Sequence, residues 1–213
     1  MARSLLASLL APLIATFTAL PLAASAAGFA TDAEGWTIPA GSGIQTWEAS
    51  GGVGGGWLRV EDIDGNSDIL LTAPSGWLGN WSTYLGGKLS FDAKNVNGIA
   101  PDWPGFAEIR IGGPGGSLLL DIAPAGLPPT DGQWHHYEVS LTSAAGWGSP
   151  GALASVLANV TSLTINGEFH AGPGEVLGID NIQVSAVPEP ASAALLLAGL
   201  GGLGLMAGLR RKR

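Results

Sequence analysis

The stretch KLSFDAK, residues 88–94, decides the fold class, because apolar and polar side chains alternate along it. Side chains of a β-strand point alternately to its two faces, so Leu89, Phe91 and Ala93 share one face. The opposite face is polar throughout. The pattern therefore predicts a half-buried β-strand, with its apolar face in the core and its polar face in solvent.

Short segments of similar character lie on both sides of residues 88–94, divided by Gly, Pro, Asp and Asn. Many short strands between turn residues are typical of an all-β sandwich. One short helix is also predicted, because Ser149 can cap it and Pro150 suits its first turn. The further strands are expected over residues 57–61, 69–72, 108–111, 118–122, 134–141, 163–169 and 177–184.

The N-terminal residues have the composition of a secretory signal peptide. Arg3 gives a short positive start, residues 5–22 are apolar, and the small residues 24–26 suit signal peptidase. We expect cleavage after Ala26, so that residues 1–26 form the signal peptide. The alternative is a membrane helix interrupted by two prolines.

The C-terminal residues 187–213 have three parts in a fixed order. The motif Pro188-Glu189-Pro190 precedes an uncharged run over residues 191–209. A helix over this run would be about 28 Å long, which is enough to cross the hydrocarbon core of a membrane. The cations that follow are expected to stay in the cytoplasm and to stop the helix there. They are Arg210, Arg211, Lys212 and Arg213.

This tripartite end resembles the PEP-CTERM sorting signal of Gram-negative bacteria. The resemblance implies that a membrane-embedded exosortase recognises the Pro-Glu-Pro motif at residues 188–190 and processes the protein for surface delivery. It also implies a membrane-anchored precursor that becomes a protein of the cell surface or the secreted extracellular matrix. An ordinary tail anchor is the alternative.

The segment between the two ends is acidic, and the chain contains no cysteine. Residues 27–186 are long enough for one domain with a sizeable core, which packing must hold without disulfides. Four basic and 16 acidic residues lie between the ends, so this part has a net charge near −12, against −8 for the whole chain. Such a negative field excludes nucleic acid as a partner and is compatible with cations and neutral sugars.

Several short sequence motifs within residues 27–186 occur in the order that is typical of one extracellular family. They are Ala73-Pro74, Leu78-Gly79, residues 84–92, Trp134, residues 137–139, Leu141, Trp147, residues 156–161, Gly167-Glu168 and residues 178–181. Together they resemble the laminin IV type A domain, also called laminin B. The resemblance implies a jelly-roll β-sandwich akin to carbohydrate-binding modules, which serves in the extracellular matrix without known catalysis.

Two sets of residues are candidates for holding a structural calcium ion. The first places side-chain oxygens at alternate positions around a glycine, as calcium loops do. Its members are Asp62, Asp64, Asn66 and Asp68. A plain acidic turn is the alternative, because Asp and Asn also favour turns. The likeness to jelly-roll modules, which often hold calcium near their first and last strands, implies a second set. It joins Asp180 with Glu48 or Glu34.

Tryptophan that faces solvent is the usual sign of glycan binding, because an indole face stacks on the C–H face of a sugar ring. Trp103 is the first candidate, since prolines flank it in a loop over residues 101–104. Trp77 and Trp81 lie in a region of Gly, Asn and Ser and come next. Packing in the core is the alternative for each of the three.

These observations predict an exported, non-catalytic β-sandwich module that binds extracellular polysaccharide. The alternative from another class is a structural or adhesive protein that contacts matrix proteins through an exposed sheet edge. A polysaccharide-active enzyme is the third hypothesis, because the fold decides which carboxylates meet. The sequence contains no nucleophile motif, phosphate-binding loop or cofactor fingerprint.

Overall fold

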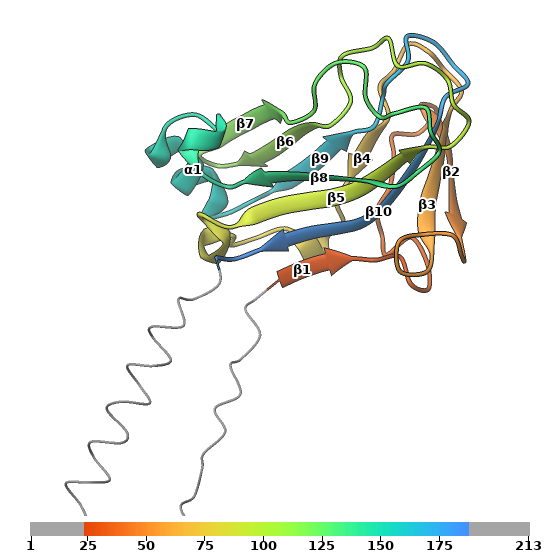
Figure 1. Ribbon diagram of the computed structural model, residues 1–213. Coiled ribbons are helices and arrows are strands. Elements are labelled where there is room, and N and C mark those ends of the chain that lie inside the picture. The colour runs from red at the N-terminus through yellow and green to blue at the C-terminus, as the bar shows by residue number, and fades with distance from the viewer. Residues whose placement is uncertain (1–23, 188–213) are drawn as a thin grey trace, which may run out of the picture.

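The computed structural model describes residues 24–187 as a sandwich of two antiparallel β-sheets (Figure 1). The expected membrane helix over residues 191–209, the sorting motif from Pro188 onward and most of the predicted signal peptide lie outside the described residues. Within residues 24–187, no helix is both long enough and apolar enough to span a membrane. The predicted all-β sandwich with one short helix is confirmed.

The described part of the chain contains ten strands, one α-helix and three short 3-10 helices over Ser75–Trp77, Ser82–Tyr84 and Ser143–Ala145. The first sheet has the strand order β2-β3-β10-β5-β8, and β1 pairs with the second half of β10. The second sheet has the order β4-β9-β6-β7. The elements are β1 (Ala24–Ala27), β2 (Gly43–Glu48), β3 (Trp57–Asp62), β4 (Leu70–Thr72), β5 (Lys88–Asn95), β6 (Glu108–Gly113), β7 (Gly116–Asp121), β8 (His135–Ser140), α1 (Pro150–Leu157), β9 (Ser162–Asn166) and β10 (Val176–Ser185).

The core lies between the two sheets and is formed by apolar side chains from both. Phe91 on β5 and Ile109 on β6 are fully buried. The Phe91 ring stacks on Tyr137 of β8 with 5.4 Å between centroids, and Tyr137 meets Phe106 edge to face at 5.2 Å. Aromatic pairs at these separations add to the stabilisation that burial itself supplies.

The polar face of the strand at residues 88–94 is predicted to be exposed to solvent, but two of its side chains are buried. Ser90 and Asp92 are only 7% and 6% exposed. β5 is an inner strand between β10 and β8, and the Asp92 carboxylate is hydrogen-bonded to His136 Nδ1 and Asn181 Nδ2, both at 2.8 Å. Side chains of the neighbouring strands therefore cover the face that alternation alone places in solvent.

The helix α1 begins where the sequence predicts it. The Ser149 hydroxyl accepts a hydrogen bond from Ala152 N at 3.2 Å, and Pro150 occupies the first turn, where its missing N–H costs nothing. Leu153, Val156 and Leu157 are buried.

The sequence pattern does not predict β1 and β2. β1 is made of small residues, and the predicted cleavage after Ala26 falls inside it, so cleavage there would leave Ala27 alone of its four residues. β2 is an edge strand whose exposure alternates along the chain, but the apolar Ile44 lies on its exposed side, so apolar and polar residues do not mark its two faces. β9 ends at Asn166, short of the predicted end, although Phe169 is still buried.

Both ends of the described chain lie at one end of the sandwich, and the loop between β9 and β10 lies at the other (Figure 1). Ala24 pairs with Ser185 at the end of β10, whereas β10 begins at Val176. The ten residues of this strand extend about 30 Å at about 3.3 Å per residue. The loop between β9 and β10 is therefore far from Val187, after which the sorting motif follows.

Candidate functional site

Three loops meet at the end of the sandwich that lies away from the chain ends. They are residues 62–69 after β3, residues 101–104 after β5, and residues 167–175 between β9 and β10. The ladder between β3 and β10 brings the first and third loops together, and Asp62 N donates to Glu175 O at 3.0 Å.

Gly65 allows these two loops to pack closely. Its φ of +60° is one that L side chains rarely adopt, and a Cβ at this position would lie 2.6 Å from Pro173 Cδ. A second backbone bond, from Gly167 N to Ile69 O at 2.7 Å, ties the end of the first loop to the end of β9. The first and third loops thus form one hydrogen-bonded unit.

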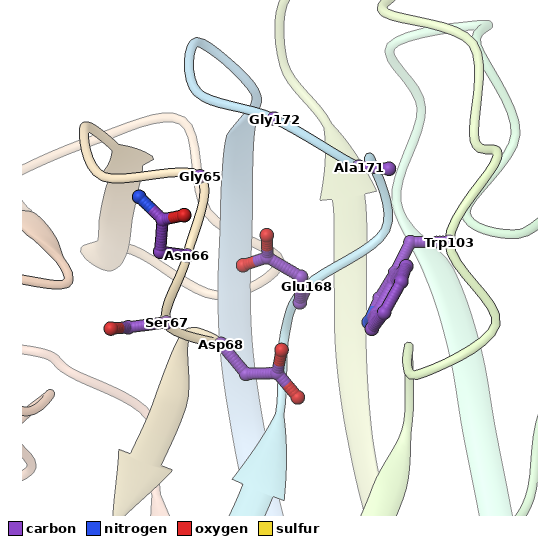
Figure 2. A pocket seen from close by; sticks show the side chains of 8 residues that line it. All are labelled: Gly65, Asn66, Ser67, Asp68, Trp103, Glu168, Ala171 and Gly172. Atoms are coloured by element: carbon purple, nitrogen blue, oxygen red, sulfur yellow. The ribbon is translucent and has the colours of Figure 1, made fainter.

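An open hollow of about 170 Å³ lies between the three loops. Figure 2 shows the Trp103 indole on one side of the hollow, Asn66 and Asp68 on the other, and the Glu168 carboxyl group between them. Trp103 is 40% exposed, as predicted for a side chain that can receive a ligand. The lining residues are Gly65, Asn66, Ser67, Asp68, Trp103, Glu168, Ala171 and Gly172.

Hydrogen bonds hold the loop that carries Trp103. The N–H groups of Asp102 and Trp103 both donate to Phe169 O, at 3.0 and 3.1 Å. The Asp102 carboxylate accepts Ala171 N–H at 2.7 Å and is hydrogen-bonded to His170 Nδ1 at 2.9 Å. The Ala171 bond, more than the His170 contact, lowers the pKa of Asp102 below its ordinary value. These bonds join the loop that carries Trp103 to the loop between β9 and β10, so the Trp103 backbone is in place before any ligand arrives.

Three buried carboxylates lie together beside this hollow. One oxygen from each of Asp62, Glu168 and Glu175 lies within 4.8 Å of the others, and within residues 24–187 no other group of three or more such side chains meets in this way. Burial is the main cause of the raised pKa values of the two glutamates, which are about 7 for Glu168 and about 8 for Glu175. Nearby negative charges, including that of Asp62, raise both values further.

The predicted calcium loop over residues 62–68 contributes only one member to this group. Asp62 points inward and is 1% exposed. Asp64 is bonded within its own loop to Asn66 Nδ2 at 3.3 Å, and Asp68 accepts Asn166 Nδ2 at 2.8 Å. The four predicted oxygen ligands therefore do not form a site by themselves.

The second predicted calcium set, Asp180 with Glu48, lies around a lysine. Asp180 accepts Val53 N–H and Asn181 N–H, both at 2.7 Å, so backbone amides bond both of its oxygens. Burial lowers the pKa of the Lys94 ammonium, and the negative charges of Asp180 and Glu48 partly offset that effect. Lys94 already supplies a positive charge beside these two carboxylates. Glu34, the alternative partner, accepts Ala30 N–H through its carboxylate at 3.3 Å.

The structure buries two of the three tryptophans predicted to bind glycan. Trp77 is 7% exposed and meets Trp36 edge to face at 5.1 Å. Trp81 is 2% exposed, and its Nε1 donates to Trp77 O at 2.7 Å. Neither ring offers an open face to a sugar, so the predicted stacking role is wrong for both and remains for Trp103.

Glu168 and Glu175 are the site residues that the sequence analysis missed. They are separated by a short loop that contains Gly172-Pro173-Gly174, a combination that favours a tight reversal of the chain. The sequence signal that could have found them is a pair of acidic residues, one on each side of such a reversal and each next to an apolar strand.

Family comparisons agree with this architecture. A family model described as Laminin B (Domain IV) matches residues 70–196, which is more than half of the chain. The chain belongs to the laminin B family. The model for the PEP-CTERM protein-sorting motif matches residues 186–212, so this laminin B protein carries an export and sorting signal at its C-terminal end. A search of curated proteins finds no match.

Solved structures share the fold at low sequence identity. The L4b domain of human laminin alpha-2 aligns with a TM-score of 0.57 at 10% identity, over 79% of this chain and 99% of that one. An exo-beta-agarase aligns with a TM-score of 0.51 at 14% identity, over 79% of this chain but 26% of the enzyme. The C-terminal family 22 carbohydrate binding module of Clostridium thermocellum Xyn10B has a TM-score of 0.46 at 13% identity, over 76% and 93% of the two chains. The alignments with the laminin domain and the agarase confirm the jelly-roll-like sandwich as the fold.

Proposed function

We propose that this laminin B protein is a non-catalytic module that binds extracellular polysaccharide through the hollow beside Trp103. The observation that carries the proposal is an accessible indole held against polar side chains (Figure 2). A sugar ring has an apolar C–H face that stacks on indole and hydroxyl groups that bond to carboxylates and amides. Asn66, Asp68 and Glu168 supply such groups on the other side of the hollow.

The size and charge of the hollow favour a single neutral sugar unit. Its volume of about 170 Å³ is below the range of about 300–1,000 Å³ that is typical of sites for drug-sized ligands. Carboxylates on its lining repel anionic groups, in keeping with the net charge near −12 of residues 27–186. A neutral unit of a longer polysaccharide fits both properties.

The position of the hollow suits a protein presented at a cell surface. An exosortase would process the chain at the Pro-Glu-Pro motif, residues 188–190, and the hollow would lie at the opposite end of β10 from that tether. Each contact would be weak, worth about 1 kcal/mol, and many copies on one surface would raise the overall affinity. The mature protein would therefore act in the matrix by multivalent binding.

Replacing Trp103 by alanine is expected to reduce retention on extracellular polysaccharide about five- to tenfold, since one stacking contact of about 1 kcal/mol is lost. The Tm should change by no more than about 2 °C, because Trp103 is largely outside the core. Affinity electrophoresis through gels that contain the polysaccharide measures the retention. Leu119→Ala is the matched control, because Leu119 is 48% exposed on the edge strand β7. Unchanged retention of the Trp103 variant would remove this residue from the proposal.

The structural or adhesive alternative is favoured by one observation. Each sheet exposes a large apolar side chain on an edge strand, Ile44 on β2 and Leu119 on β7. Such edges can pair with another chain. If Leu119→Ala lowers matrix retention and Trp103→Ala does not, protein contacts at a sheet edge explain the function better than sugar binding does.

A further inference from the structure

We propose that Asp62, Glu168 and Glu175 form a calcium-binding site next to the hollow, which ties the ends of β3 and β9 to the start of β10. The site differs from both calcium sets that the sequence predicts, because two of its three ligands come from the loop between β9 and β10. It does not depend on sugar binding.

Each carboxylate of the group accepts a hydrogen bond from a backbone N–H through one of its oxygens. Asp62 Oδ1 accepts Asp64 N–H at 3.1 Å. Glu168 Oε2 accepts Ile69 N–H at 3.1 Å, and Glu175 Oε1 accepts Phe169 N–H at 3.0 Å. These bonds fix the orientation of all three carboxylates, so the site is organised by the folded loops before an ion binds.

The second oxygens of two of these carboxylates lack any partner. Asp62 Oδ2 and Glu175 Oε2 are buried without a hydrogen bond in the described part of the chain, and the two residues are 1% and 0% exposed. A buried carboxylate oxygen without a donor is costly, so natural structures rarely leave one unsatisfied. An ion held between the carboxylates would satisfy both oxygens at once.

No basic side chain of residues 24–187 neutralises the group. Salt bridges pair the arginines and one lysine with glutamates elsewhere, and Lys94 lies over the rings of Trp57 and Trp134 at 4.0 and 4.5 Å. The pairs are Arg59–Glu61, Lys88–Glu138 and Arg110–Glu108. Within residues 24–187 no lysine or arginine therefore balances three ionised carboxylates, and a bound cation would supply that charge once Glu168 and Glu175 lose their protons.

The geometry and the ligand type favour calcium. Oxygens that bind one calcium ion at about 2.3–2.6 Å lie at most about 5 Å from one another, and the oxygens of this group lie within 4.8 Å. All three ligands are carboxylates, the hard oxygen donors that calcium prefers, and the group has neither the cysteine nor the histidine that zinc favours. Glu168 also lines the hollow, which leaves a path for the ion and for water ligands.

Thermal unfolding of the detergent-purified full-length protein tests the proposal. After treatment with EDTA, calcium chloride at about 10 mM should raise the Tm by about 3–10 °C, as expected for an extracellular site of millimolar affinity or better. Calorimetric titration should show that Glu175→Gln lowers the calcium affinity at least about tenfold. An identical Tm in calcium and in EDTA would overturn the proposal.

Two variants distinguish loss of calcium binding from loss of the folded structure. Glu175→Gln keeps the shape of the side chain and removes its ability to ionise, so its Tm in EDTA should equal or exceed that of the wild type while its response to calcium falls. Asp64→Asn is the matched control, because Asp64 lies in the same loop outside the group and should keep the full response. A wild-type response in Glu175→Gln would contradict the assignment.

Discussion

Replacing Phe91 by alanine is expected to lower the free energy of unfolding by about 3–5 kcal/mol, the range found for large-to-small changes of buried aromatic residues. Phe91 is fully buried on an inner strand, and its ring stacks on Tyr137, which in turn packs against Phe106. The cavity would therefore open at the centre of the sandwich. For a domain of this size the Tm should fall by about 10 °C or more, which calorimetry or circular dichroism would measure.

The matched control for this loss is Leu119→Ala. Leu119 is 48% exposed, so its truncation should change the free energy of unfolding by no more than about 0.5 kcal/mol. If Phe91→Ala melted as close to the wild type as Leu119→Ala does, the packing described for the core would be incorrect.

The calcium-free protein is expected to lose stability as the pH rises from 5 to 9. The pKa values of Glu168 and Glu175 are raised in the folded state to about 7 and about 8, mainly by burial, whereas an unfolded glutamate titrates near 4.3. Between these limits the folded state binds more protons than the unfolded state, so the free energy of unfolding falls with rising pH. The loss begins above pH 4 to 5 and is complete once the folded carboxyl groups have ionised, near pH 9.

A difference of one between the folded and unfolded pKa is worth about 1.4 kcal/mol, so the Tm in EDTA should fall by at least about 3–6 °C over this range. Glu175→Gln is the control, because it removes one of the two groups and leaves the three histidines in place. The variant should show a shallower decline and a higher Tm than the wild type at pH 9. A wild-type Tm that is level or rises from pH 5 to pH 9 would contradict this account of the buried carboxylates.

Much of the sandwich follows from local patterns in the chain. Alternation predicts the strands around Phe91, and the Ser149-Pro150 pair predicts the start of α1, because both signals depend on neighbours in sequence. β1 escapes prediction, since small residues carry no alternation and acquire strand structure only by pairing with β10. The burial of Asp92 escapes prediction for a related reason, because the groups that cover it come from β8 and β10.

The candidate site shows the same division between local and long-range information. Trp103 is predictable because its proline neighbours indicate an exposed loop. The meeting of Asp62 with Glu168 and Glu175 depends on pairing between β3 and β10, across more than a hundred residues of sequence. Spacing in the loop over residues 62–68 predicts calcium ligands that are neighbours in sequence, whereas the carboxylates that meet Asp62 lie between β9 and β10.

Trp77 and Trp81 mislead because their sequence neighbours are typical of exposed turns. The turns in which they lie cover the core, and Trp81 N donates to Leu157 O of α1 at 2.7 Å. Local composition places the backbone in a turn, but only the tertiary packing decides which way the indoles point.

The claim that this laminin B module binds sugar is tested most directly by probing a glycan array with the purified protein. We predict binding to at least one neutral polysaccharide, with a signal that Trp103→Ala reduces and Leu119→Ala does not. A folded wild-type protein that binds none of the glycans, but binds other matrix proteins through its sheet edges, would contradict the account.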